Sequence, residues 1–388
     1  MLDLTGGRIA PAAARARQDI VQPRPKSCGV TPRDRMLTAL RRGQPDRVPV
    51  WELIVNQPII SALAGPQSSY FDLVDALDLD GVTIFENQRM TPTADGGLLD
   101  EWGIKWGIGA AGVPYPVRGP IESYGDLGAY RPPDADAQWR LDDLKAAIER
   151  FKGRRAVVFL THDAFEFSAN LRGMENLLAD YLEAPDFVRE LGGLVIEYKL
   201  GVLRRALEMG ADAVVAGDDY AWRGGPMMSP SHFREFILPS LRQLVEVTHG
   251  AGRPFIKHTD GRIWPLMEDL LAAGIDALHP LEPMARMDIG EVKERCGERI
   301  ALCGNIDCTA LLPGGSTTEV EEAVKETIAK AGPGGGFVLS SSNSIHPAVR
   351  PENFRAMVGA ARRWGRYPLE EGMVAAYRGR DYMARVRG

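Results

Sequence analysis

The chain has 388 residues, of which 45% are hydrophobic and 25% charged, as in a folded globular protein rather than a disordered or fibrous one. Its net charge of −6, with lysine and arginine scattered along the sequence, argues against a nucleic-acid or anionic-membrane surface. Four unevenly spaced cysteines and no 18-residue apolar run predict a cytoplasmic protein without a disulfide framework, secretory signal or membrane span.

The first 30 residues lack helical periodicity and are expected to form a flexible arm, followed by one domain over 31–388. A helix is predicted from the Thr31-Pro32 pair, an N-cap followed by a proline, through Arg42. Beyond it, short β-branched runs predict eight strands, over 47–53, 81–87, 156–163, 212–219, 253–260, 275–282, 299–307 and 336–343. Because helical patterns alternate with these runs, we expect a parallel sheet closed into a (β/α)8 barrel, the TIM-barrel fold.

The connection between the second and third strands, residues 88–155, is too long for a single crossover. It contains DEWGIKWGIGAAGVPYPV, whose aromatic and glycine content predicts a β-hairpin leaning over the barrel mouth. We interpret this segment as an insertion rather than a separate domain.

Polar side chains end all eight predicted strands, where a barrel of this kind carries its active site. A lone Asp or Asn at a strand end is otherwise a turn or cap residue. The candidate substrate-binding residues at or just beyond these ends are Trp51, Glu52, His162, Asp163, Asp218, Asp219, Trp222, Asn305, Asp307 and Asn343. The two tryptophans would stack on a planar substrate, although wall packing is the alternative for aromatics at a barrel mouth.

His258 and Asp260 stand two apart on the fifth strand, so their side chains point the same way, and Glu282 ends the neighbouring strand. One imidazole and two carboxylates form a plausible open site for zinc or another divalent ion. A hydrogen-bonded His–Asp pair without metal is the alternative. Cys303, inside an apolar run, is a weaker candidate ligand and more typical of a core residue. His346, past the eighth strand, is a proton donor or a loop residue, and His279 is expected at the surface or at a helix end.

Three stretches carry a family resemblance: TPRDRMLTALRRGQPDRVPVWE at 31–52, GADAVVAGDDYAWRGGPMMSPSHFREFILP at 210–239, and the run from FIKHTDG through LCGNIDC to GGGFVLSSSNSIHPAVRPENFRAM. From about residue 31 onward the chain resembles the uroporphyrinogen decarboxylase superfamily, whose fold is similar to the barrel predicted above. The resemblance implies one of two chemistries. These are decarboxylation of uroporphyrinogen and zinc-dependent methyl transfer involving corrinoid proteins, as in coenzyme M methyltransferases and O-demethylase components.

The segment after the first strand favours the second branch. True decarboxylases carry an MRQAGR-type segment there, whose arginines meet the substrate carboxylates, whereas this chain reads WELIVNQPII at 51–60. A mouth lined by Glu52, Asp218, Asp219, Asp260 and Glu282 would also repel a substrate with eight carboxylates.

The methyltransferase branch holds zinc with a His-x-Cys-Gly motif, an acidic residue near the end of the sixth strand and a later cysteine. This chain reads His258-Thr259-Asp260-Gly261, Glu282 matches the acidic position, and Asn343 stands in place of the later cysteine. Without the two thiolates, a bound zinc would be less neutralised and a stronger Lewis acid, suited to polarising an ether, phenol or carboxylate oxygen.

The resemblance and its departures together predict a zinc-dependent methyltransferase. It would move a methyl group from a small O-methyl donor, such as an aryl methyl ether, to a corrinoid supplied by a partner protein, with Tyr220 or His346 providing a proton. Two alternatives stay open: a decarboxylase or lyase, with or without metal, acting on a small aromatic or porphyrin-related acid, and a non-catalytic ligand-binding barrel. A homodimer is the default expectation.

Overall fold

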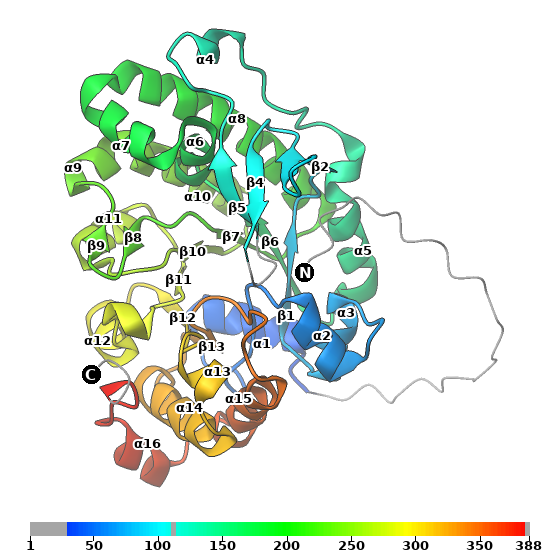
Figure 1. Cartoon of the computed structure of the whole chain (residues 1–388). Helices are drawn as coiled ribbons and strands as arrows, with labels where there is room; N and C mark the ends of the chain where they lie inside the picture. Colours follow the sequence, from blue (N-terminus) through cyan, green and yellow to red (C-terminus); the bar gives the residue numbers. More distant parts are fainter. Residues whose placement is uncertain (1–28, 110–113, 385–388) are drawn as a thin grey trace, which may run out of the picture.

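The computed structural model describes residues 29–109 and 114–384, and a parallel sheet of seven strands runs through it (Figure 1). In spatial order these are β1 (Gly81–Phe85), β6 (Ala156–Thr161), β7 (Ala213–Ala216), β10 (Phe255–His258), β11 (Ala277–His279), β12 (Ala301–Ile306) and β13 (Phe337–Ser341). The sheet order follows the chain order, as the barrel prediction requires. The predicted N-terminal arm lies outside the described residues except for its last two positions.

The predicted first strand is an irregular segment that closes the barrel between β13 and β1. On one side Trp51 N–H donates to Leu339 O at 3.1 Å, and on the other Asp80 N–H donates to Val50 O at 2.8 Å. The expectation of a regular strand here was wrong, because Pro49 has no N–H to donate and the Asp80 carboxylate accepts from Val50 N–H at 2.8 Å in place of a strand partner.

The Asp80 carboxylate also stabilises the closed barrel through ion pairs. It is fully buried and pairs with Arg35 from the first helix, at 2.5 Å, and with Arg47 from the closing segment, at 3.0 Å. Both guanidinium groups are largely buried as well. Removal of the carboxylate would therefore leave two buried cations without their shared partner.

Small and branched side chains that alternate along the strands fill the barrel interior, among them Val158, Leu160, Val215, Ile256, Cys303 and Val338. Helix α1 (Pro32–Leu40) packs Met36 and Leu40 into the same cluster. Its N-cap Thr31 accepts from Asp34 N–H at 3.0 Å, which confirms the predicted helix start. The polar strand ends are thus left at the opposite, carboxyl side of the barrel.

Helices surround the sheet, and most follow a strand in the alternation expected of the fold (Figure 1). They are α2 (Gln57–Ala64), α3 (Tyr70–Ala76), α4 (Asp126–Ala129), α5 (Asp142–Phe151), α6 (Phe165–Arg172), α7 (Met174–Glu183), α8 (Pro185–Met209), α9 (Pro230–His232), α10 (Leu238–Gly250), α11 (Met267–Ala272), α12 (Ile289–Cys296), α13 (Leu311–Gly314), α14 (Thr317–Ala331), α15 (Pro351–Trp364) and α16 (Glu371–Tyr377). Short 3-10 turns span Gln138–Leu141, Trp264–Leu266 and Pro283–Ala285, and a π-helical turn spans Phe233–Ile237. Within the described residues, no helix has the length and apolar character that a bilayer crossing requires.

The insertion after β1 holds a larger sheet than the expected hairpin. Four antiparallel strands pair in chain order: β2 (Met90–Pro92), β3 (Leu98–Asp100), β4 (Lys105–Ile108) and β5 (Pro114–Arg118). Helix α5 at the end of the 88–155 segment packs on β1 and β6 and serves as their crossover helix. A second, two-stranded hairpin, β8 (Ala221–Trp222) and β9 (Gly225–Pro226), follows β7.

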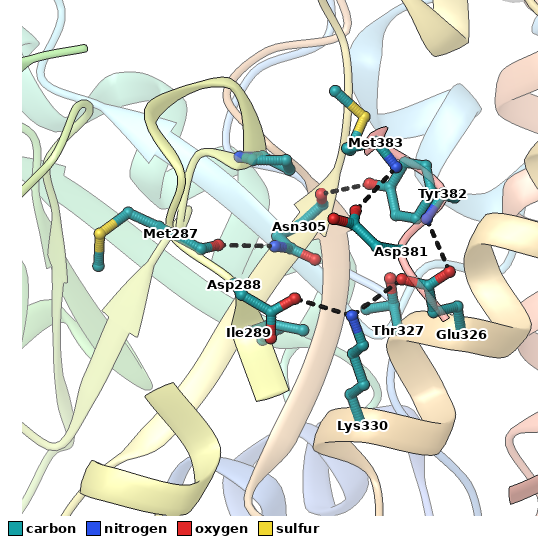
Figure 2. A pocket seen from close by; sticks show the side chains of 11 residues that line it. Met287, Asp288, Ile289, Asn305, Glu326, Thr327, Lys330, Asp381, Tyr382 and Met383 are labelled. Atoms are coloured by element: carbon teal, nitrogen blue, oxygen red, sulfur yellow. Dashed lines mark hydrogen bonds and ion pairs between the residues drawn. The ribbon is translucent and has the colours of Figure 1, made fainter. Parts of the chain in front are cut away.

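The last described residues return to the barrel beside β12 (Figure 2). Tyr382 donates from its hydroxyl to Asn305 O at 3.1 Å, and Asn305 Nδ2 donates to Leu281 O at 3.0 Å and reaches Met287 O at 3.5 Å. The cavity between them measures about 20 Å³, room for a single water molecule. Asn305, predicted as a substrate ligand, is therefore part of a structural contact between the C-terminal segment and the barrel.

Candidate metal centre at the barrel mouth

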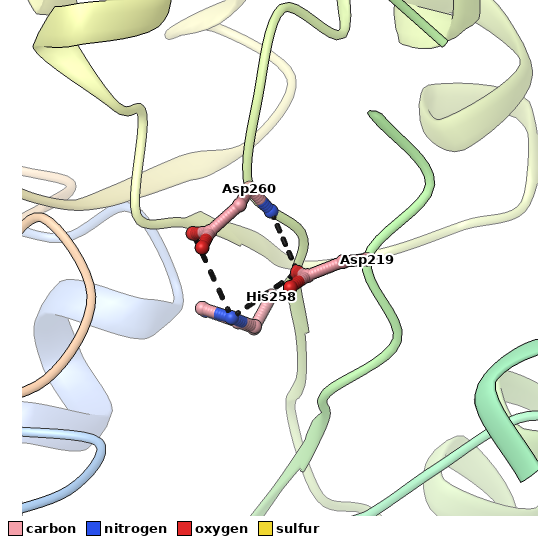
Figure 3. Close-up of side chains that lie close together, drawn as sticks. All are labelled: Asp219, His258 and Asp260. Carbon is pink, nitrogen blue, oxygen red and sulfur yellow. Dashed lines mark hydrogen bonds and ion pairs between the residues drawn. The ribbon is translucent and has the colours of Figure 1, made fainter. Parts of the chain in front are cut away.

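Asp219, His258 and Asp260 converge at the carboxyl ends of the neighbouring strands β7 and β10 (Figure 3). His258 Nε2 lies 3.5 Å from Asp219 Oδ1 and 3.9 Å from Asp260 Oδ1, and the three donor atoms lie within 4.8 Å of one another. Ligand atoms of a tetrahedral zinc, each about 2.0–2.2 Å from the ion, are about 3.4 Å apart. The cluster thus has nearly the spacing that one divalent ion requires.

The charges and hydrogen bonds of this cluster also fit a cation. Asp260 Oδ1 is buried and has no hydrogen-bond partner among the described residues. Burial raises the pKa of Asp260, and the nearby Asp219 and Glu282 raise it further. Burial also raises the pKa of Asp219 to about 6 and lowers that of His258, which keeps the imidazole neutral. A neutral imidazole beside two carboxylates that form no ion pair with lysine or arginine among the described residues is a suitable donor set for a divalent ion.

Hydrogen bonds between the strand ends hold the cluster in place. Asp260 N–H donates to Asp219 Oδ1 at 2.8 Å, and Tyr220 N–H donates to Thr259 Oγ1 at 2.8 Å, so the loops after β7 and β10 are tied together. Asn343 Nδ2 donates to Asp260 Oδ2. Asn343, predicted to bind substrate, therefore orients the Asp260 carboxylate.

Glu282, predicted as the third ligand, lies beside the cluster rather than in it. Its Oε2 accepts from Gly261 N–H at 3.1 Å, and its Oε1 lies 3.4 Å from Arg223 Nε. Strand β11 ends at His279, three residues before the predicted end, because Pro280 cannot continue the ladder. Asp219, predicted only as a substrate contact, occupies the third position instead.

A second network of buried charges lies around Tyr220. Its hydroxyl donates to Asp163, whose carboxylate lies 3.8 Å from Lys257 Nζ, and the same ammonium sits 4.0 Å from the centre of the Tyr220 ring. Asp218 accepts from the N–H groups of Asp163 at 2.6 Å and Glu166 at 2.8 Å. Burial raises the pKa of Asp163 to about 8. These contacts shape the loops that follow β6 and β7, and the Tyr220 hydroxyl is bonded to this network rather than to the cluster.

Trp51 and Glu52 are fully buried, in contrast to the open positions expected for substrate contacts. Trp51 Nε1 donates to Thr83 Oγ1 at 2.9 Å, and its ring packs edge-on against His279 with centroids 5.3 Å apart. The Glu52 carboxylate accepts from Ser341 N–H at 3.0 Å and from Ser341 Oγ at 2.6 Å. Trp51 therefore supports the His279 side chain, and Glu52 supports the backbone of Ser341.

Three more candidates have structural contacts in the described part of the chain. Asp307 Oδ1 accepts from two backbone N–H groups of the turn that follows it, at 2.6 and 2.8 Å. His346 Nε2 donates to a backbone carbonyl at 2.7 Å, while its Nδ1 accepts from a backbone N–H at 3.3 Å. Cys303 is fully buried in the apolar inner layer, and burial raises the pKa of its thiol. It is not a member of the cluster.

Trp222 and His162 are the remaining predicted substrate contacts. Trp222 is 64% exposed on the β8–β9 hairpin, and its carbonyl accepts from Arg262 N–H at 2.9 Å, which ties the hairpin to the loop that carries Asp260. His162 lies 3.6 Å from Glu166 and packs against the Phe167 ring, and burial lowers its pKa to about 4. Trp222 is thus an exposed aromatic on the hairpin whose backbone contacts the loop that carries Asp260.

The expectation that His279 lies at the surface was wrong. His279 is fully buried on β11, directly opposite His258 in the sheet register, and a 2.7 Å hydrogen bond joins the two Nδ1 atoms. A signal for this was present in the sequence, because His279 lies within the predicted strand 275–282, as His258 does within 253–260. Sequence patterns alone do not reveal which residues of adjacent strands lie opposite each other.

Comparison with known proteins gives the following similarities. The family model described as "Uroporphyrinogen decarboxylase (URO-D)" matches residues 73–364. A uroporphyrinogen decarboxylase of Thioalkalivibrio sulfidiphilus is 26% identical over 86% of this chain and 98% of its own length, and one of Alkalilimnicola ehrlichii is 24% identical over 84% and 93%. A solved "methyltransferase from Methanosarcina mazei" superposes with a TM-score of 0.68 at 21% identity, over 86% of this chain and 98% of that one, and so shares the fold.

Proposed function

We propose that this chain, which belongs to the uroporphyrinogen decarboxylase family, is a metal-dependent methyltransferase. It transfers a methyl group from a small O-methyl donor, such as an aryl methyl ether, to a corrinoid carried by a partner protein. The main support for the proposal is the convergence of Asp219, His258 and Asp260 at the barrel mouth. The fold shared with a protein described as a methyltransferase supports it.

Asp219, His258 and Asp260 would hold a zinc or other divalent ion, which supplies Lewis-acid stabilisation for the negative charge that develops on the donor oxygen. The donor set contains two carboxylates and no thiolate, so it leaves more of the cation's charge available to a substrate oxygen than a thiolate-rich site would. Asn343 and the backbone of Asp260 keep the two carboxylates at their positions while the donor binds.

The surroundings of the cluster favour a donor with a good leaving group. Tyr220 and His346, the two predicted proton donors, are hydrogen-bonded to Asp163 and to a backbone carbonyl. A phenolate has a conjugate acid with a pKa of about 10 and can leave before it takes a proton from water. An aryl methyl ether therefore suits this site better than an alkyl ether, whose alkoxide needs a proton at the moment of cleavage.

The proposed reaction requires a reduced corrinoid as its second substrate. The methyl–oxygen bond breaks, the oxygen keeps the bonding electron pair, and the methyl carbon bonds to Co(I), which is oxidised to Co(III). Trp222, exposed beside the loop that carries Asp260, supplies an aromatic surface on which an aryl donor can stack.

Decarboxylation of a polycarboxylate substrate is less compatible with the charges near the cluster. Asp219, Asp260 and Glu282 are acidic, and Arg223 beside them is already paired with Glu282. The buried ammonium of Lys257 is bonded to the carbonyl of Asp218 and lies near Asp163. A substrate with many carboxylates requires cationic partners that are free to bind it.

The test combines metal analysis with a methyl-transfer assay. The purified protein is expected to bind about one zinc per chain and to convert cob(I)alamin to methylcobalamin with a panel of aryl methyl ethers, releasing one phenol per methyl group. His258→Ala and Asp219→Asn should lose both zinc and transfer. Glu282→Gln is the matched control and should keep the zinc.

Two results would contradict the proposal. Release of phenol or carbon dioxide without any corrinoid would move the decarboxylase or lyase alternative to first place. Loss of zinc in Glu282→Gln with retention in Asp219→Asn would instead restore the ligand set expected from the sequence.

A further inference from the structure

A chain of hydrogen bonds runs from His258 into the barrel wall, away from the metal cluster. His258 Nδ1 lies 2.7 Å from His279 Nδ1, and His279 Nε2 lies 3.0 Å from Ser340 Oγ. Ser340 Oγ in turn donates to the backbone carbonyl of Ser341 at 3.0 Å. His279 and Ser340 are fully buried, and His258 is nearly so, so water does not compete for these bonds.

The positions of the protons in this chain follow from its far end. The carbonyl of Ser341 can only accept, so it takes the single hydroxyl proton of Ser340. Ser340 Oγ must then accept from the His279 ring, which places a proton on His279 Nε2.

The proton between the two histidines is assigned next. Two N–H groups cannot face each other across 2.7 Å, so one of the two Nδ1 atoms carries a lone pair. The His279 ring is fully buried and forms no ion pair with a carboxylate among the described residues, so it stays neutral and holds one proton, the one on Nε2. His279 Nδ1 is therefore the acceptor, and His258 donates from Nδ1.

We propose that His279 and Ser340 are positioning residues that select the Nδ1–H tautomer of His258 and thereby point the Nε2 lone pair at the metal cluster. That nitrogen faces Asp219 Oδ1 at 3.5 Å and Asp260 Oδ1 at 3.9 Å, the two carboxylates that would share the ion. His258 thus has the tautomer that metal binding requires before any metal binds. The functional meaning of this tautomer rests on the proposed metal centre, whereas the tautomer itself does not.

The residues around the chain hold it in this arrangement. The Trp51 ring packs edge-on against His279, and the His258 and His279 rings lie with centroids 4.9 Å apart. The Glu52 carboxylate accepts from both the N–H and the hydroxyl of Ser341, which fixes the residue whose carbonyl ends the chain. Ring rotation of His279 would break bonds at both of its nitrogens.

The direct test is the ¹⁵N NMR spectrum of the metal-free, full-length protein with labelled histidine, assigned by comparison with His258→Gln and His279→Gln. We expect a protonated Nδ1 and an unprotonated Nε2 on His258, with the reverse on His279. An Nε2–H tautomer of His258 in the metal-free protein would overturn the proposal. The spectrum of the unmodified chain decides this, so it does not depend on the folding of any variant.

The second test measures zinc affinity by competition with a chromophoric chelator in His279→Leu and His279→Asn. The two side chains have nearly the same shape, but only asparagine places an acceptor oxygen where His279 Nδ1 stood. Loss of a partner of this kind typically weakens metal affinity 10–100-fold. We expect that loss in His279→Leu and an affinity about tenfold tighter in His279→Asn. Equal affinities in the two variants would overturn the positioning role, because a merely structural role predicts no such difference.

The two tests separate this inference from the proposed function. If His258 has the expected tautomer but the protein binds no zinc, the proposed metal centre fails and the proton assignment stands. If zinc binds and methyl transfer occurs while His258 has the other tautomer, the proposed function stands and this inference fails.

Discussion

Glu52 gives a pH-dependent prediction whose sign and size follow from the structure. Its carboxyl group is fully buried, and burial raises its pKa to about 8, although two hydrogen bonds from Ser341 oppose the shift. In the unfolded chain its pKa is about 4.3. Between these values the folded protein binds a proton that the unfolded chain has released. The contribution of Glu52 to stability is therefore complete below about pH 4 and is lost as the pH rises toward about 8.

The slope of that loss is about 1.4 kcal/mol per pH unit. Glu52→Gln has the same shape and no titrating group, so it lacks this dependence. The free energy of unfolding of the unmodified protein, minus that of Glu52→Gln, should fall by about 2.5 kcal/mol between about pH 5.5 and 7.5. Other titrating groups contribute equally to both proteins and cancel in the difference.

Urea unfolding at four or five pH values, followed by circular dichroism, measures this difference. A difference that stays constant across the range would refute the reasoning, because it would mean that Glu52 has the same pKa in both states. A difference that rises with pH would show that the folded protein stabilises the carboxylate. The Ser341 contacts would then outweigh burial.

Three further predictions use the same logic of burial and partners. Asp80→Ala should cost about 3–5 kcal/mol in urea unfolding because it removes the fully buried carboxylate that two largely buried guanidinium groups share. Asp186→Ala, whose carboxylate is 98% exposed, should cost well under about 1 kcal/mol. Similar losses would contradict the role of Asp80 in barrel closure. Cys303→Ala should keep one zinc per chain and lower the melting temperature, because the Cys303 thiol lies in the apolar inner layer. Loss of zinc would identify Cys303 as a ligand after all. Trp222→Ala should raise KM for an aryl donor. It should change the free energy of unfolding by no more than about 0.5 kcal/mol, because the side chain is 64% exposed. An unchanged KM would show that Trp222 does not contact the substrate.

Local sequence signals were sufficient for most of the fold. The β-branched runs correspond to the seven regular strands, and the Thr31 N-cap begins a helix where predicted. The predictions for the first strand and for the insertion were less accurate. In the first predicted strand, the Asp80 carboxylate replaces a strand partner of Val50. In the insertion, the sheet depends on antiparallel contacts among four very short strands.

For the candidate site, the sequence by itself determined which chemical groups stand at the barrel mouth. The period of two along a strand placed His258 and Asp260 together, and both lie in the cluster. Only the tertiary structure decided that Asp219 joins them while Glu282 bonds to Gly261, and that His279 lies behind His258. The physical reason is that periodicity orients side chains within one strand, whereas contacts between strands depend on register and on where each strand ends. Strand β11 ends at His279 because Pro280 follows it, and that one backbone feature separates the predicted ligand set from the observed cluster.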